Sequence, residues 1–462
     1  MPHSDPTDAR WRARRLAARL AYVVVVLIAT WSGLYLDPNL ALAKLRLARG
    51  LHPGFRPMDV LDAVRNVALF AGLGGVWLVT GDPARLGRGV LAATLVGTAL
   101  SVVAETAQLF SPRRMASVLD LLTNGGGAFL GAAAVAYAIA VVARRRARTV
   151  AAVVPHLLVA GPYLAACLCE AFSAWGRPDL VPDAAGGFRT RWRASVADFR
   201  LHPHALPMWS DLLLFAPAGF LATRVLIERG ASPARAATVA TTLGALTWGV
   251  AEVLRGLSGA DLRPWAVVLH ALATLLGAVF AATLAAREAR GAGRGVTLAD
   301  RLVRLRSSAR AYVALLFLWS LRPFAPVTSV GELLGKLSWD ALVPLRALAG
   351  LWSLHSVADV AVGFLLYLPV GAWFSVRTRA DGRTPRAPWW GLALAVATEV
   401  AQIAIRGRDF DITDVMVQGA GVLVGWAIVR RADARRDRLQ LTAQREAVMP
   451  GTRAARTQSA LG

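Results

Sequence analysis

The division of the apolar residues into long blocks constrains this chain more than any other feature. Stretches such as Leu20–Leu36, Val90–Ala107 and Phe129–Val142 are separated by arginine-rich segments, and the pattern continues to Trp426. Blocks of about 20 residues match the length that a helix needs to cross about 30 Å of hydrocarbon. With 56% hydrophobic residues overall, the chain is predicted to be an all-α, polytopic integral membrane helix bundle.

The net charge of +23 does not indicate a nucleic-acid-binding protein, because its placement follows the apolar blocks. Arginines gather at block ends, over 10–19, 144–148 and 287–310. Basic residues at the cytoplasmic ends of membrane helices are typical of multi-pass proteins. We therefore expect membrane lipids as partners, no nucleic acid, and both termini in the cytoplasm.

An internal repeat determines the expected architecture. Three segments share a polar or small residue, an aromatic residue four positions later, and a glycine four positions beyond that. They are Asn66–Phe70–Gly74, Asp211–Phe215–Gly219 and Gly363–Tyr367–Gly371. This spacing places each trio on one stripe of a helix.

A second signature follows the first and third segments. Starting from Glu105 and Glu399, matching residues stand at offsets +3, +9, +15, +19, +22 and +26. They are Gln108, Arg114, Asp120, Asn124, Gly127 and Gly131 in one copy, and Gln402, Arg408, Asp414, Gln418, Gly421 and Gly425 in the other. The middle copy keeps Glu252 but has lost the polar set, with His270 at the Asn/Gln position.

These repeats predict about twelve transmembrane helices arranged as three four-helix units. We place a cytoplasmic N-terminal segment at 1–17, repeats at 18–143, 150–287 and 309–430, a basic cytoplasmic linker at 288–308, and a disordered basic tail at 431–462. The second repeat is expected to be degenerate. The turns that carry the second signature, and the long segments between the first and second helices, are expected to face outward.

The candidate ligand-binding residues are ionisable and amide side chains at the outward helix ends. Such groups are costly at membrane depth and are functional candidates for that reason. The candidates are Glu105, Gln108, Arg114, Asp120, Asn124, Glu399, Gln402, Arg408, Asp414, Gln418, Asp62, Asn66 and Asp359. The sequence contains no HExxH, CxxC, GxSxG or P-loop motif, so we expect neither a metal nor another cofactor.

A structural role competes with ligand binding at some of these positions. Ser117 and Asp411 stand at N-cap positions, three residues before Asp120 and Asp414, where an acidic residue favours the positive end of a helix. Arginines in the same turns would then hold the turns closed. Pairs of small residues such as Gly127 and Gly131 are expected to allow close helix packing.

The aromatic-x-Pro-x-Gly segment, followed by Glu-x-x-Gln, Arg, Asp, Asn and Gly, resembles the VanZ-like family of bacterial membrane proteins. The first repeat departs from that pattern with Gly72 in place of the proline, and the third with Gln418 in place of the asparagine. The family takes its name from a member associated with low-level teicoplanin resistance. The resemblance implies tandem VanZ-like units in the inner membrane, linked to the cell envelope or to glycopeptide antibiotics.

Three functions remain open from the sequence. The first is a non-enzymatic envelope protein that binds or moves a polar or amphiphilic ligand, such as an envelope precursor or a glycopeptide. The second is a membrane enzyme acting on a lipid-linked substrate, with Glu105 or Glu399 as general base and Arg114 or Arg408 gripping phosphate. The third is a scaffold without a ligand.

Overall fold

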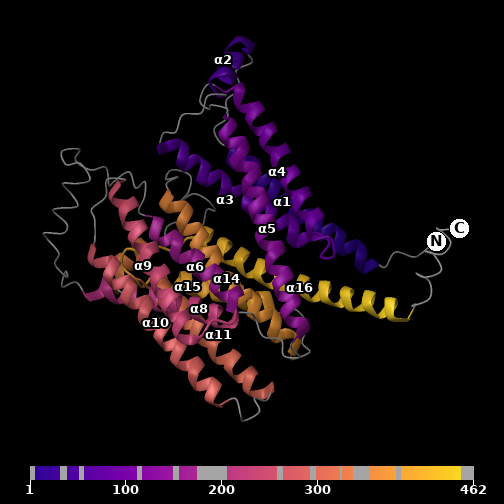
Figure 1. Ribbon diagram of the computed structural model, residues 1–462. Helices are drawn as coiled ribbons and strands as arrows, with labels where there is room; N and C mark the ends of the chain where they lie inside the picture. The colour runs from indigo at the N-terminus through magenta and orange to yellow at the C-terminus, as the bar shows by residue number, and fades with distance from the viewer. Residues whose placement is uncertain are drawn as a thin grey trace. The chain divides into compact units, whose positions relative to one another are not determined.

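The computed structural model is helical throughout the residues that it describes (Figure 1). These residues are 6–31, 39–50, 57–111, 117–148, 156–173, 205–257, 264–291, 298–322, 325–336, 354–380 and 387–448. Within these ranges the extended backbone is limited to one isolated antiparallel bridge, between Pro326 and Ile405. The all-α class predicted from the sequence is confirmed.

The helices fall into two compact units. One comprises 1–54, 66–152 and 427–462, and the other comprises 55–65 and 153–426. The helices of the first repeat are α1 (Pro6–Trp31), α2 (Leu40–Gly50), α3 (Pro57–Thr80), α4 (Leu86–Leu109) and α5 (Val118–Arg148). Those of the middle repeat are α6 (His156–Ser173), α8 (Ala205–Glu228), α9 (Pro233–Leu257) and α10 (Pro264–Gly291). Those of the third are α11 (Leu298–Ser320), α12 (Val330–Gly335), α14 (Leu354–Ala380), α15 (Ala387–Gln402) and α16 (Ile412–Val448).

Six described helices are long and apolar enough to cross a membrane. They span 62–80, 86–109, 118–143, 265–289, 358–375 and 412–442. Leucines and valines on their outer faces are widely exposed, as expected of surfaces that contact lipid rather than water. The chain is a multi-pass membrane protein, while the total of twelve spans stays a prediction.

The second and fourth helices of every repeat cross at the same glycines. A Cβ added to Gly131, Gly277 or Gly425 would lie 1.8–1.9 Å from a backbone oxygen of the partner helix. Because no side chain fits there, the two backbones touch, as small-residue pairs in membrane helices allow. The middle repeat keeps this crossing although its polar residues have been replaced.

Tyrosines on the first helices hold the second helices of repeats one and three. The Tyr22 hydroxyl donates to Leu69 O at 3.1 Å, and the Tyr312 hydroxyl donates to Leu366 O at 2.8 Å. A Cβ on Gly72 would lie 1.7 Å from Tyr22 Oη. Glycine therefore stands at this position because the tyrosine hydroxyl occupies the space beside it.

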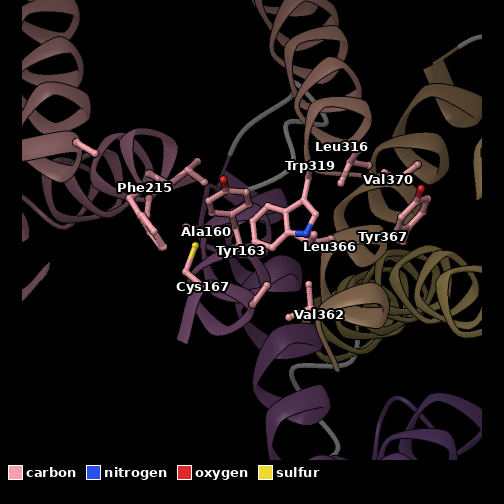
Figure 2. Packing of buried hydrophobic residues seen from close by; sticks show 14 of the residues in the cluster. Ala160, Tyr163, Cys167, Phe215, Leu316, Trp319, Val362, Leu366, Tyr367 and Val370 are labelled. Atoms are coloured by element: carbon pink, nitrogen blue, oxygen red, sulfur yellow. The ribbon is translucent and has the colours of Figure 1, made fainter. Parts of the chain in front are cut away.

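The core of the second unit is aromatic (Figure 2). The Tyr163 ring meets the rings of Tyr312 and Trp319 edge-on, with centroids 6.2 Å apart in both pairs. Cys167 is buried beside them. It is a small apolar side chain of the core, as its position inside an apolar block indicates.

One expectation about the segments outside the main helices needs correction. The basic tail, expected to be disordered from residue 431, is helical to Val448 because it extends a membrane helix with good helix formers and needs no new nucleus. The long segments between the first and second helices of repeats one and three contain α2 and α12.

Candidate functional site

The third repeat places a carboxyl group in its interior, one turn before the end of α15. Glu399 is 0% exposed. Its Oε1 accepts a hydrogen bond from Gln402 Nε2 at 2.9 Å and another from Gln418 Nε2 at 2.5 Å. Its Oε2 is buried without a hydrogen-bond partner. The structure thus joins three predicted site residues, from α15 and α16, around one carboxyl oxygen.

A hydroxyl network extends this site to α14. Thr398 Oγ1 lies 2.5 Å from the Tyr367 hydroxyl and 3.4 Å from Gln418 Oε1. All three side chains are buried. The hydroxyls orient the Gln418 amide so that its NH₂ group points at Glu399. Its oxygen accepts from Thr398, and its nitrogen donates to the carboxyl.

The C-terminal end of α15 is held by a segment that sequence patterns did not single out. Residues 325–327 pair with 404–406 through Val327 N to Ala404 O (2.9 Å) and Arg406 N to Ala325 O (2.6 Å). Arg406 also forms an ion pair with Glu332 on α12 at 3.2 Å. Lys336 donates to the carbonyls of Ile405 and Arg408.

Arg408 has a structural partner in this arrangement. Its Nε donates to Arg322 O at 3.0 Å, while its charge acts on both Glu399 and Asp414. Asp414 is half-buried at the start of α16, within electrostatic range of Asp359. Asp411 caps that helix through Thr413 N to Oδ1 at 2.7 Å, so the predicted N-cap is confirmed.

The first repeat uses its corresponding glutamate differently. Glu105 is half-buried, and its Oε2 accepts a hydrogen bond from the backbone N–H of Ser117 at 2.8 Å. Ser117 Oγ accepts from Leu119 N at 3.1 Å, which confirms the cap of α5. Glu105 therefore satisfies a backbone donor at the start of the next helix. The corresponding amide in the third repeat, that of Asp411, is also a backbone donor directed at the Glu399 carboxyl, but it does not complete a hydrogen bond to Oε2.

Two further bonds of the first repeat connect predicted residues to each other or to a neighbour. Asn66 Nδ2 donates to Asp120 Oδ1 at 2.8 Å, which joins α3 to α5. Asn124 Nδ2 donates to Ser101 Oγ at 2.8 Å, which joins α5 to α4. Asn124 is 2% exposed, and its Oδ1 has no partner. Gln108 is also buried.

The remaining predicted residues are peripheral or not described. Asp62 is exposed and pairs with Arg65 at 2.8 Å. Arg114 lies outside the described residues. In the middle repeat the equivalent layer is filled by the rings of Phe215, Trp248 and His270, with centroids 4.1–4.5 Å apart.

Sequence reasoning missed several residues of these sites. Tyr367 was part of the repeat motif but was not among the candidate site residues, and Thr398 directly precedes Glu399. Lys336 and Arg46 are equivalent: each stands 24 residues after the tyrosine of its first helix. Arg46 Nη1 donates to Leu109 O at 3.0 Å, and Lys336 donates to carbonyls a few residues further along its repeat, those of Ile405 and Arg408. The sequence signal was faint, consisting only of a basic residue in the long segment between the first and second helices of each of these two repeats.

The described residues contain no group of three His, Cys, Asp or Glu side chains placed to hold a metal ion.

A family model described as VanZ/LLP1 matches residues 6–141 and 310–433. These are the regions of the first and third repeats, and the middle repeat falls between them. No curated protein and no solved structure matches the chain.

Proposed function

The chain belongs to the VanZ/LLP1 family, and on that premise we propose that it binds or moves a polar or amphiphilic ligand of the bacterial cell envelope at the Glu399 site. The Glu105 site has a structural role in the first repeat. The protein acts in the cytoplasmic membrane, with both termini in the cytoplasm and the Glu399 end of α15 facing outward.

The buried Glu399 carboxyl is the observation that carries this proposal. Burying a charged or polar group without full hydrogen bonding costs free energy, so folded proteins rarely retain one for packing alone. Gln402 and Gln418 satisfy one oxygen and leave Oε2 without a donor. A ligand that supplies the missing donor would recover part of that cost.

The chemistry of the site restricts the ligand class. An ionised carboxylate only accepts hydrogen bonds, whereas a protonated carboxyl would carry its proton on Oε2, because Oε1 already accepts from two amides. A hydroxyl or amide group of the ligand can pair with either form, since each of these groups both donates and accepts hydrogen bonds. The nearby hydroxyls of Thr398 and Tyr367 are bonded to each other and support the amides instead. Sugars and peptides of envelope precursors carry such donors, and so do glycopeptide antibiotics.

The enzymatic alternative has less support from these contacts. It assigns Arg408 to a substrate phosphate, whereas the Nε of Arg408 is bonded to Arg322 O. The buried carboxyl and its amides resemble a binding cradle, and the ligand-binding proposal needs no reacting group.

Glycopeptide susceptibility of cells that express variants of the full chain tests the proposal. Glu399→Gln keeps the size of the side chain but replaces an acceptor oxygen, and we expect it to abolish the susceptibility difference between cells with and without the protein. Glu105→Gln is the matched control and should retain that difference. Immunoblots of membranes must show equal abundance for both variants.

A folded, normally abundant Glu399→Gln protein with full effect on susceptibility would contradict the proposal. Equal loss in both variants would contradict the assignment of a structural role to Glu105. A loss of abundance in Glu399→Gln alone would show that the carboxyl stabilises the fold rather than binding a ligand.

A further inference from the structure

Arginines from the two ends of the sequence converge in the first unit. Arg15 and Arg19 lie on α1, while Arg431 and Arg438 lie on the last part of α16. Arg431 is half-buried and within electrostatic range of the other three. Bringing like charges together at a partly desolvated place is unfavourable unless an anion compensates them.

Part of this cluster is anchored by the protein itself. Arg19 Nε donates to Thr80 Oγ1 at 2.8 Å, and its guanidinium lies over the Trp77 ring, 4.3 Å from the centroid. Arg438 pairs with Asp82 at 2.8 Å. These contacts account for two of the four guanidinium groups.

The guanidinium groups of Arg15 and Arg431 keep N–H donors that no acceptor among the described residues uses. Arg15 Nε is buried without a partner, and Arg431 donates no hydrogen bond to any described residue. Asp433 and Asp437 lie on the same stretch of α16, but Asp437 pairs with Arg436 at 3.3 Å. Residues 430–438 contain five arginines and two aspartates. Asp82 is a further acidic group that acts on Arg431, and with it the local charge stays positive.

The surface beside the cluster is apolar and faces outward from the bundle. Leu16, Leu20 and Ile28 follow one stripe of α1 and are 55–59% exposed. Such a stripe on a membrane helix contacts acyl chains, and Leu16 directly follows Arg15. The arginines therefore stand where a lipid headgroup meets its chains.

We propose that Arg15 and Arg431, supported by Arg19 and Arg438, bind the phosphate of an anionic phospholipid at this end of the bundle. Guanidinium groups suit phosphate because their planar donors match its oxygens. A basic cluster between helices at the membrane surface is a known arrangement for anionic headgroups. A phospholipid satisfies both the charge and the apolar stripe, whereas a soluble phosphate satisfies only the charge. This site is separate from Glu399 and does not depend on the function proposed for it.

Lipid binding to the full chain in detergent tests the proposal, with dioctanoyl phosphatidylglycerol as probe and native mass spectrometry as readout. Dioctanoyl phosphatidylcholine controls for the acyl chains, and glycerol 3-phosphate controls for the phosphate alone. We expect phosphatidylglycerol to bind best. Arg15→Gln/Arg431→Gln should weaken it by about tenfold or more, since each arginine near an anionic headgroup contributes about 1 kcal/mol.

Arg229→Gln/Arg235→Gln is the matched control, because both arginines are exposed on the middle repeat and the charge change is the same. It should bind phosphatidylglycerol as the wild type does. Arg15→Lys/Arg431→Lys, which keeps the charge, should retain most of the affinity. If the double glutamine variant does not fold, the single Arg15→Gln variant is compared with the wild type instead. It should lose less affinity for phosphatidylglycerol than the double variant would.

Three results would overturn the proposal. Equal binding of phosphatidylglycerol and phosphatidylcholine would show that the headgroup charge is not recognised. Wild-type affinity in the folded glutamine variants would place the lipid elsewhere. Competition by glycerol 3-phosphate at the same concentration as the lipid would assign the cluster to a soluble phosphate.

Discussion

The sites of the first and third repeats start from the same motif and reach different states. Glu105 is half-buried and bonds to a backbone amide, whereas Glu399 is fully buried and bonds to two side-chain amides. In the first repeat Asn124 donates to Ser101 instead, and Asn66 donates to Asp120. The third repeat has Gly363 where the first has Asn66.

The difference shows how one carboxyl position can serve two purposes on one scaffold. The extra methylene of Gln418 compared with Asn124 gives its amide a longer reach, and it bonds to the glutamate. Asparagine at the equivalent position bonds to a serine hydroxyl on α4. The neighbouring positions differ as well: Ala395 stands in the third repeat where Ser101 stands in the first, and Thr398 stands where Ala104 does. The length of the amide side chain and these neighbours together determine which partner the amide reaches.

The largest predicted effect concerns the helix crossing that the two repeats share. Gly131→Leu and Gly425→Leu should each destabilise the folded protein by about 4 kcal/mol or more, because a backbone occupies the space where the side chain would lie. Gly126→Leu is the control, since nothing lies within 4 Å of its Cβ position. Unfolding in detergent measures all three, and a tolerated Gly425→Leu would show that the third repeat packs differently.

Removal of the amides distinguishes a charged partner from a neutral one. Gln418→Met should cost about 3 kcal/mol, because it takes a donor from a buried carboxyl, whereas Asn124→Leu removes a bond to a hydroxyl and should cost about 1 kcal/mol. Chemical denaturation of both purified variants gives the two values. Equal costs would indicate that the two amides have equivalent surroundings.

The basic residues of the segments between the first and second helices test whether both repeats are held in the same way. Lys336→Met and Arg46→Met should each lose about 1 kcal/mol and expose their segments to limited proteolysis, with the larger effect at Lys336 because it donates to two carbonyls. Lys44→Met is the control, since Lys44 is exposed on α2. Unchanged proteolysis of Lys336→Met would remove the role assigned to it.

The smallest predicted effect is a gain of stability in the third repeat. Gly363→Asn should give the third repeat the bond that Asn66 makes to Asp120, here to Asp414, and raise the free energy of unfolding by about 1 kcal/mol. The space allows it, because the nearest atom to a Cβ at this position is 3.6 Å away, on Val417. Gly363→Ala separates this gain from that of helix propensity, and equal gains in both variants would contradict the predicted bond.

The sequence by itself determined the class of fold, the repeat and the identity of the carboxyl sites. Long apolar blocks leave a chain in lipid few alternatives to helices, because a helix satisfies its backbone hydrogen bonds internally. The matched offsets from Glu105 and Glu399 singled out both carboxyls as candidates, and the loss of the polar set in the middle repeat was also visible in the sequence, whereas its aromatic filling was not predicted.

Only the tertiary structure decided which carboxyl is enclosed and what surrounds it. The partners of Glu399 come from two helices, and the segment that holds the end of α15 lies about 70 residues earlier in the chain. Such contacts depend on side-chain reach and helix crossing rather than on local periodicity. The arginine cluster has the same origin: its members stand more than 400 residues apart in the sequence, and the fold of the first unit brings them together.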